Sequence, residues 1–333
     1  MAKTLFVLPR EAGASAAIND DRGFSDREHQ GSLLTAFYEQ SKILPFVTTR
    51  PVPKASKAVW FDDMGTVAVT EKTEGTATDG TAGPGQERIT IPLDLKKIIT
   101  EKYVGDNDMH MVNTAWSANL GTRQGQALAN VVDKRMFQAL ALGAAVAART
   151  IDGSVFPAGI SVDAPVDGAV TVAYPLTMQG SERLQASLAG LAQTMDEGNL
   201  PREGRVAFLT PYLARVLRID KTIQSFDFTH GENDLLSRTV TKVEGFMIVE
   251  TNEIPSTLIE AGETAYRGDF TDIVLLAIAS PEALGLVDIG GVQNEGPDRD
   301  PETHASLIQA HYWMGGKYIK ANQCAKVVLT TAE

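Results

Sequence analysis

Residues 60–91 constrain the fold of this chain more than any other segment. Residues 75–85 contain four glycines and one proline, a composition that cannot form a helix and packs poorly inside a strand. The apolar residues 67–69 lead into the tip, and residues 88–91 lead out of it with alternating polar and branched side chains, as strands favour. The segment therefore predicts a long two-stranded arm with a glycine-rich tip.

Such an arm needs something to lie against, because an isolated two-stranded ribbon is only marginally stable in water. The economical partner is another copy of the same chain. Contacts between subunits are therefore predicted at the tip of the arm. The candidate contact residues are Gly75, Gly80, Gly83, Gly85 and Arg88.

The bulk composition limits the classes of function. With 333 residues, of which 43% are hydrophobic, the chain can build two domains or one elaborated domain. The net charge of −12 argues against a protein that grips nucleic acid but suits a wall that encloses it. The single cysteine, Cys324, forms no internal disulfide and indicates a reducing compartment. No stretch approaches the length of a transmembrane helix, so no membrane contact is predicted.

The first part of the chain predicts an arm and two helices. Residues 1–31 have little to pack on themselves, and are either a disordered tail or an extended arm that orders against neighbours. Residues 31–42 are typical of a short helix that ends before Pro45. The longest helical pattern lies in residues 111–147, where glycines restrict the expected helix to residues 125–147. A helix of that length spans roughly 30 Å and suits the spine of an elongated molecule.

The pattern of residues 150–290 predicts one lobe of alternating strands and helices. Thr210 followed by Pro211 indicates an N-cap and the first residue of a helix. The other expected elements are short strands within residues 152–175, an amphipathic helix whose apolar face runs from Leu184 to Met195, a strand at 205–209, two strands around a turn at Glu244 and Gly245, and a central apolar strand at 272–279.

The C-terminal part predicts strands that return to the long helix. Strands are expected at residues 305–314 and 317–319, with Gly315 and Gly316 as the hairpin turn between them. A further strand is expected at residues 326–330. The acidic residues 295–302 that precede these strands are typical of a solvent-facing loop.

The sequence contains no recognisable enzyme signature. The five histidines lack the spacing of a zinc site, and one cysteine cannot form a structural zinc centre. A nucleophile elbow and a complete phosphate-binding loop are also missing from the sequence. Residues 105–108 lack the bidentate glutamate that a calcium loop requires. No catalytic residue, metal site or cofactor is therefore predicted.

The order of these elements resembles one known family. An arm, a short helix, an extended loop, a long helix, an α/β lobe and a closing strand pair follow one another as in the major capsid protein of tailed bacteriophages, a fold shared with encapsulin shells. The chain is compact and has no obvious scaffold or protease segment, and in this it resembles the proteins of short-tailed phages. The stretches that carry the resemblance are residues 121–133, 208–217, 240–255, 281–285 and 309–318.

This resemblance implies an α+β fold and a division of the chain. The implied parts are an N-terminal arm at 1–31, a peripheral domain with the spine helix at 32–53 and 92–150, an extended β-hairpin loop at 54–91, an α/β axial domain at 151–303, and closing strands of the peripheral domain at 304–333.

The resemblance also implies a structural function. The chain is expected to self-assemble through hexamers and pentamers into the icosahedral head of a virion, inside the host cytoplasm. It would enclose double-stranded DNA without sequence-specific binding. A portal protein is another partner that the resemblance implies. A long N-terminal scaffolding segment, which some relatives carry, is not found here, so a scaffold, where the shell needs one, is expected to be a separate scaffolding protein.

Three other functions remain open from the sequence. An encapsulin-like cargo shell is the nearest, and it would need a pocket that docks cargo. A soluble enzyme would have its site in residues 150–290, where no nucleophile, metal or cofactor signal occurs. A tail or connector protein conflicts with the order of loop, spine helix and lobe.

Overall fold

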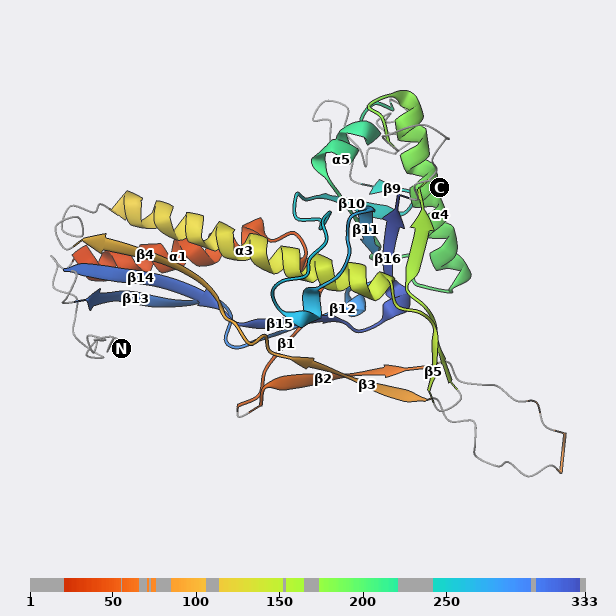
Figure 1. Ribbon diagram of the computed structural model, residues 1–333, viewed down its shortest axis with the longest axis horizontal. Coiled ribbons are helices and arrows are strands. Elements are labelled where there is room, and N and C mark those ends of the chain that lie inside the picture. The colour runs from red at the N-terminus through yellow and green to blue at the C-terminus, as the bar shows by residue number, and fades with distance from the viewer. Residues whose placement is uncertain are drawn as a thin grey trace. The chain divides into compact units, whose positions relative to one another are not determined.

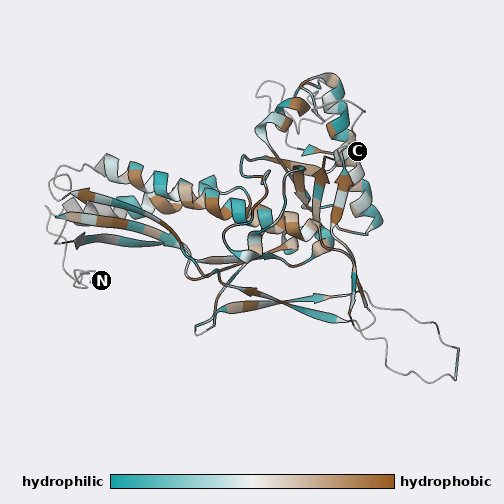
Figure 2. Ribbon diagram, viewed as in Figure 1, coloured by the Kyte–Doolittle hydropathy of each residue, from teal (hydrophilic) through white to brown (hydrophobic). Residues whose placement is uncertain are grey.

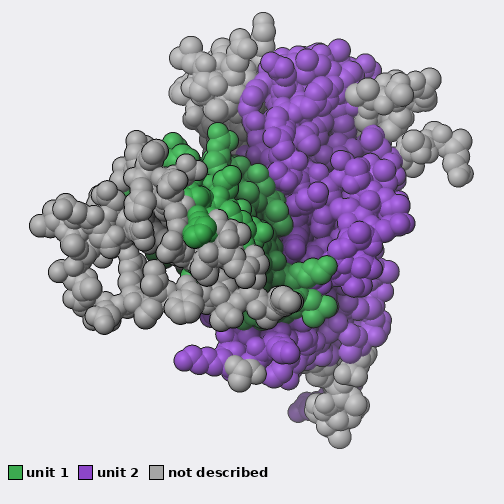
Figure 3. Space-filling view, turned by 60° about the vertical axis from the view of Figure 1, so that its left-hand side comes forward, with its two compact units in different colours: residues 1–44, 93–133, 288–314 green, residues 45–92, 134–287, 315–333 purple. Residues whose placement is uncertain are grey.

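The computed structural model describes residues 21–54, 56–65, 71, 73–75, 85–105, 114–151, 154–164, 174–220, 242–300 and 304–329. Figure 1 labels its helices and strands. The chain divides into two compact units, each built from three segments (Figure 3). Unit 1 comprises residues 1–44, 93–133 and 288–314, and unit 2 comprises residues 45–92, 134–287 and 315–333. The domain boundaries predicted from the sequence stay a prediction.

Unit 1 combines helices with a three-stranded antiparallel sheet. Its helices are α1 (Asp21–Gln40) and the first part of α3 (Thr114–Ala144). Its strands are β4 (Ile98–Gly105), β13 (Gln293–Asp300) and β14 (Ala305–Tyr312), with β14 in the middle. The ring of Phe37 in α1 lies 5.3 Å from that of Tyr312 in β14, so aromatic packing joins the helix to the sheet.

Helices α1 and α3 approach each other closely at two glycines of α3. A Cβ atom on Gly121 would lie 2.4 Å from the carbonyl oxygen of His29, and one on Gly125 would lie 2.4 Å from that of Leu33. The end of α1 is fixed by Asp133, which is almost fully buried. Its carboxylate accepts hydrogen bonds from the Ser41 hydroxyl at 2.5 Å and from the Lys42 backbone N–H at 2.7 Å.

Unit 2 is built around a six-stranded mixed sheet with the strand order β7-β16-β11-β8-β10-β9. Helix α4 begins where the side chain of Thr177 caps it, and α5 begins at Pro211 after the cap Thr210. The elements are β7 (Ile160–Asp163), α4 (Met178–Glu197), β8 (Val206–Leu209), α5 (Pro211–Leu217), β9 (Lys242–Val243), β10 (Phe246–Glu250), β11 (Ile273–Ile278) and β16 (Cys324–Val328).

The core of unit 2 lies where α4 covers this sheet. Leu184, Leu188, Leu191 and Met195 of α4 are fully buried and belong to one cluster with the central strands. The brown colouring of these strands in Figure 2 reflects the continuous apolar sequence of a buried strand. On another side of the sheet, Phe208 packs edge-on against Phe137 of α3, with ring centroids 4.9 Å apart.

The remaining elements of unit 2 are short. A three-stranded sheet has the order β1-β12-β15, and two ribbons pair β2 with β3 and β5 with β6. Their bounds are β1 (Thr48–Pro51), β2 (Ala58–Met64), β3 (Gln86–Pro92), β5 (Arg149–Ile151), β6 (Ser154–Phe156), β12 (Leu284–Asp288) and β15 (Met314–Tyr318), with 3-10 turns at Leu44–Phe46, Thr264–Tyr266, Pro281–Ala283 and Ala321–Gln323.

Several local predictions are confirmed. The lobe contains the predicted amphipathic helix, the capped helix after residues 205–209, and the strand in residues 272–279. Glu244 and Gly245 both have positive φ, 50° and 81°, between the antiparallel strands β9 and β10. They therefore form the predicted turn. None of the helices in the described part of the chain is both long and apolar enough to cross a membrane.

Four predictions about elements are wrong in detail. The first helix begins at Asp21, so residues 21–31 are helical and not extended. Helix α3 begins at Thr114, eleven residues before the predicted start at 125. It ends at Ala144, three residues before the predicted end at 147. Gly315 and Gly316 lie inside β15 and form no turn. Most of the acidic segment 295–302 belongs to strand β13, paired with β14, and is not a loop.

Candidate assembly surface

The predicted arm is present as an antiparallel ribbon of β2 and β3 (Figure 1). Its register places Phe61 opposite Ile89, Trp60 opposite Thr90, and Asp62 opposite Arg88. Because side chains alternate between the faces of a strand, this register sorts the residues into two unlike faces. The predicted strand at residues 67–69 lies outside the described residues.

The inner face of the arm packs on its own unit. Phe61, Ile89 and Ile91 are nearly or fully buried in one cluster with Val287 and Ile319. Each fully buried aliphatic or aromatic side chain contributes about 1.5–3 kcal/mol of hydrophobic stabilisation. The base of the ribbon is therefore held by its own chain and does not depend on a neighbour for stability.

The outer face of the arm leaves large apolar side chains uncovered. Trp60 is 59% exposed and Met64 is 67% exposed. Arg88 lies between them in the ladder: its guanidinium is 5.4 Å from the Trp60 ring, and its Nε donates a hydrogen bond to Asp62 at 3.3 Å. An exposed ion pair of this kind adds little stability. A tryptophan and a methionine on one solvent-facing surface are instead typical of a contact surface.

Two glycines lie at the end of the ribbon, and one of them, Gly85, bonds to the β5–β6 hairpin. The Gly65 N–H donates to the Gly85 carbonyl at 3.0 Å, and the Gly85 N–H donates to the Ser154 hydroxyl at 2.6 Å. A Cβ atom on Gly85 would lie 2.4 Å from the Ile151 carbonyl oxygen. Glycine is required at position 85 by this close approach within the chain.

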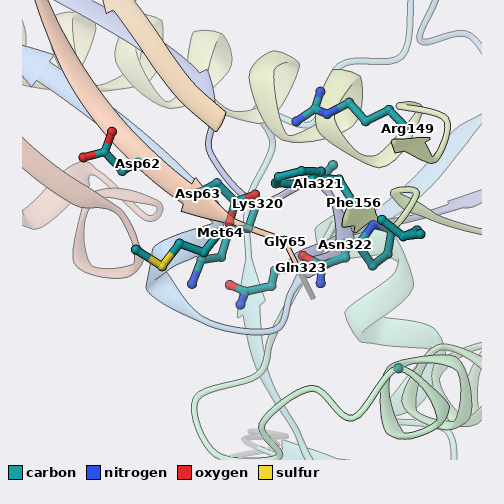
Figure 4. Close-up of a pocket in the computed structure, with 13 residues that line it drawn as sticks. Asp62, Asp63, Met64, Gly65, Arg149, Phe156, Lys320, Ala321, Asn322 and Gln323 are labelled. Carbon is teal, nitrogen blue, oxygen red and sulfur yellow. The ribbon is translucent and has the colours of Figure 1, made fainter. Parts of the chain in front are cut away.

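A groove of about 490 Å³ opens beside the end of the arm (Figure 4). The arm contributes residues 62–65, the hairpin contributes Arg149 and Phe156, and residues 320–323 line the remaining side. Burial raises the pKa of the Asp63 carboxyl above its ordinary range, while the charges of Lys320 and Arg149 oppose this rise and that of Glu87 adds to it. The groove is thus lined by charges of both signs.

The five predicted contact residues do not all lie together. Arg88 is exposed on the outer face, and Gly75 lies in a turn with φ of +90° and no other atom near its missing Cβ. Gly85 is buried against the hairpin. Gly80 and Gly83 lie outside the described residues. Contacts between subunits at these five positions stay a prediction.

Trp60 and Met64 were missed as candidate contact residues. The signal for them is present in the sequence, because both are two residues from Asp62 and therefore share its face of a strand. The glycines predict contacts at the tip of the arm, whereas the alternation of side chains along the strand identifies its exposed apolar face.

The structure contains no obvious chemical centre among its described residues. No group of three or more histidine, cysteine or acidic side chains in these residues is placed to hold a metal ion. His29 is buried and its Nε2 lies 2.8 Å from Gln124 Oε1, which makes it part of the α1–α3 packing. The thiol of Cys324 is fully buried, and burial raises its pKa above the ordinary value.

Comparison of structures relates this arrangement to known shells. The chain is similar to the capsid of the cyanophage P-SCSP1u, with 22% sequence identity, 86% of this chain and 87% of that chain covered, and a TM-score of 0.71. For the mature capsid of bacteriophage PhiM1 the identity is 17%, the coverage is 88% of each chain, and the TM-score is 0.70.

The chain has the tailed-phage capsid fold. The predicted α+β class and the predicted fold are therefore confirmed. A virus-like particle from Pyrococcus furiosus is also similar, at 13% identity over 91% of this chain and 98% of that chain, with a TM-score of 0.53. No protein-family model and no curated protein sequence matches the chain.

Proposed function

We propose that this chain is the major capsid protein of a tailed bacteriophage, and that many copies close an icosahedral head around double-stranded DNA. The capsid fold supports the proposal. The observation that carries it is the two-faced arm, whose inner face packs on its own chain while Trp60 and Met64 stay exposed on the outer face. Identical chains in a shell can bury an exposed tryptophan and methionine that share one face.

In this proposal the outer face of the arm lies on a neighbouring copy within a hexamer or pentamer. Trp60 supplies the apolar anchor, and Arg88 over its ring supplies a donor at the rim. Gly75, at φ of +90° with open space around it, would let this turn adapt to contacts that differ slightly around the shell.

The other partners follow from the same role. A separate scaffolding protein and a portal protein would direct assembly in the host cytoplasm. The net charge of −12 favours an inner wall that does not trap the packaged DNA. The role is structural, and we propose no catalytic activity.

A cargo shell is the alternative that a specific observation favours, because the virus-like particle from Pyrococcus furiosus has the same fold. The two functions differ in what fills the shell. Shells isolated from the native source should contain double-stranded DNA in the capsid case and protein in the cargo case. Nuclease treatment and mass spectrometry of the contents separate these outcomes.

The first test is electron microscopy of the chain expressed alone, combined with light scattering. Closed shells or curved sheets are the expected result, because the assembly surface belongs to the chain itself. A monomer that neither salt, nor a crowding agent, nor a purified scaffolding protein converts into shells would contradict the proposal.

Replacing Trp60 with serine should reduce the yield of shells at least tenfold. Truncating an anchor side chain typically removes about 2 kcal/mol or more of binding energy at each contact, and each 1.4 kcal/mol is about a factor of ten. The yield is measured by sedimentation and microscopy. Trp60→Phe is the matched control, since it keeps an aromatic anchor and should assemble nearly normally.

Removing residues 75–84 is a second change to the arm, and it spares Gly85. This deletion should also prevent assembly while the circular dichroism of the chain remains that of a folded protein. Normal shells from both the deletion and Trp60→Ser would show that the arm is not the contact.

A further inference from the structure

Five charged groups gather at the end of the arm. Asp63 and Glu87 are direct partners in the β2–β3 register and lie on the same, inner face. Arg149 of β5 contacts Glu87, and Lys320 contacts Glu282. Three carboxylates and two cations leave one negative charge without compensation.

That excess charge falls on Asp63. Glu87 and Glu282 each have a cation in direct contact, whereas Asp63 makes no ion pair with any other described residue. It is half-buried beside the groove in Figure 4, with Lys320 and Arg149 acting on it only at longer range. Ionising Asp63 costs free energy chiefly because the carboxylate is half-buried. Glu87 adds to this cost, while Lys320, Arg149 and a hydrogen bond with the Met64 backbone offset part of it.

The opposite face of the same strand behaves differently. Asp62 has its own cation, Arg88, at 3.3 Å, and both side chains are about half exposed, 49% and 63%. Neutralising Asp62 therefore removes a weak solvent-screened pair and relieves no repulsion. Asp62 and Asp63 form a matched pair of adjacent carboxylates in unlike surroundings.

We propose that the end of the arm is a pH-sensitive latch. Ionised Asp63 favours a ribbon end that opens to water, because its charge is then hydrated, and this loosens the contact of the ribbon with the β5–β6 hairpin. One proton on Asp63 balances the cluster of five groups, and the contact tightens. The protonation state of Asp63 would govern two hydrogen bonds, from the Gly65 N–H to the Gly85 carbonyl and from the Gly85 N–H to the Ser154 hydroxyl.

The direction of the pH effect follows from linkage. The pKa of Asp63 is raised above its ordinary value of 3.8, chiefly by burial, so the closed latch holds the proton more tightly than the open latch. The stabilisation is complete below the ordinary pKa and is lost as the pH rises through the raised pKa. Acid therefore closes the latch, and a rise in pH above the raised pKa loosens it.

The latch is a property of the single chain and does not depend on the proposed role in a shell. It gives the arm two states that differ in how firmly its end is held, while the apolar cluster around Phe61 and Ile89 keeps the base in place. A protein can use such an element to change its contacts when the pH changes.

Hydrogen exchange of the full chain tests the latch. Protection of residues 58–65 and 85–92 is measured from about pH 7.5 down to about pH 4.5, after correction for the intrinsic pH dependence of exchange. In the unmodified chain the protection should rise about two- to fivefold on acidification, because the cost of holding a half-buried charge is removed. Strands β8 and β11 serve as an internal reference that should not respond.

Three variants make the test decisive. Asp63→Asn should be highly protected at both ends of the pH range, Asp63→Glu should keep the pH response, and Asp62→Asn should behave as the unmodified chain does. A pH response that survives in Asp63→Asn, or that Asp62→Asn abolishes equally, overturns the proposal. Loss of protection throughout β8 and β11 in Asp63→Asn would mean that this variant fails to fold. The test then uses the unmodified chain and Asp63→Glu: if the protection of residues 58–65 and 85–92 does not change with pH in either protein, the proposal is overturned.

Discussion

Replacing Arg205 with methionine should lower the free energy of unfolding by about 3 kcal/mol, because each hydrogen bond to a charged group contributes about 1.5–3 kcal/mol and the Leu200 and Pro201 carbonyls would lose this donor. The Arg205 side chain is 3% exposed. Its guanidinium donates to the Asp196 carboxylate at 2.7 Å, to the Leu200 carbonyl at 3.1 Å and to the Pro201 carbonyl at 2.9 Å. These bonds hold the chain where it leaves α4.

Arg202→Met is the matched control, since Arg202 contacts the same carboxylate at 2.9 Å but is 80% exposed. An exposed pair of this kind contributes about 0–1 kcal/mol, so this variant should unfold at nearly the same urea concentration as the unmodified chain. Urea unfolding followed by circular dichroism measures both. Equal losses in the two variants would mean that burial does not govern the contribution of this ion-pair network.

Local signals were sufficient to predict the elements that local rules determine. The predicted cap Thr210 accepts a hydrogen bond from the Leu213 N–H at the start of α5. Ser280 follows the same rule and caps the turn at Pro281–Ala283 by accepting from the Glu282 N–H. Both bonds join residues two or three positions apart in the chain. The residue types alone therefore identify them.

Predictions from glycines are wrong where the glycine is needed for a close contact with a residue far away in the sequence. Gly316 was expected to form a turn, but it lies in β15, where a Cβ atom would be 2.5 Å from the sulfur of Met136 in α3. Its N–H donates to the Tyr266 hydroxyl at 2.8 Å. The nearest sequence neighbours do not contain this information, because the two contacts are 180 and 50 residues away.

The candidate assembly surface was predictable only in part. Alternation in residues 58–64 is a local signal, and it correctly implies a ribbon with Phe61 and Trp60 on opposite faces. It does not say which face packs on the chain itself. That choice depends on Val287 and Ile319, which approach the ribbon from β12 and from the end of β15.

The early start of α3 also has a spatial cause. Gly121 and Gly125 were expected to weaken a helix, yet α3 continues through both, because they let α1 approach. Gly125→Ala should therefore destabilise unit 1 by about 2 kcal/mol, within the range of about 1–3 kcal/mol for overpacking. The added Cβ would lie 2.4 Å from the Leu33 carbonyl oxygen and 3.1 Å from the Ala36 Cβ.

Helix propensity alone would give the opposite sign, since alanine is favoured over glycine by about 0.8–1 kcal/mol inside a helix. Gly190 of α4 provides the control, because a Cβ there would meet only Val162, at an ordinary contact distance of 3.7 Å. Gly190→Ala should therefore stabilise the protein by about 0.5–1 kcal/mol. Thermal unfolding of the two variants measures both signs. If Gly125→Ala also stabilises the chain, then α1 and α3 can separate without loss, and the close approach of their backbones contributes nothing to the stability of unit 1.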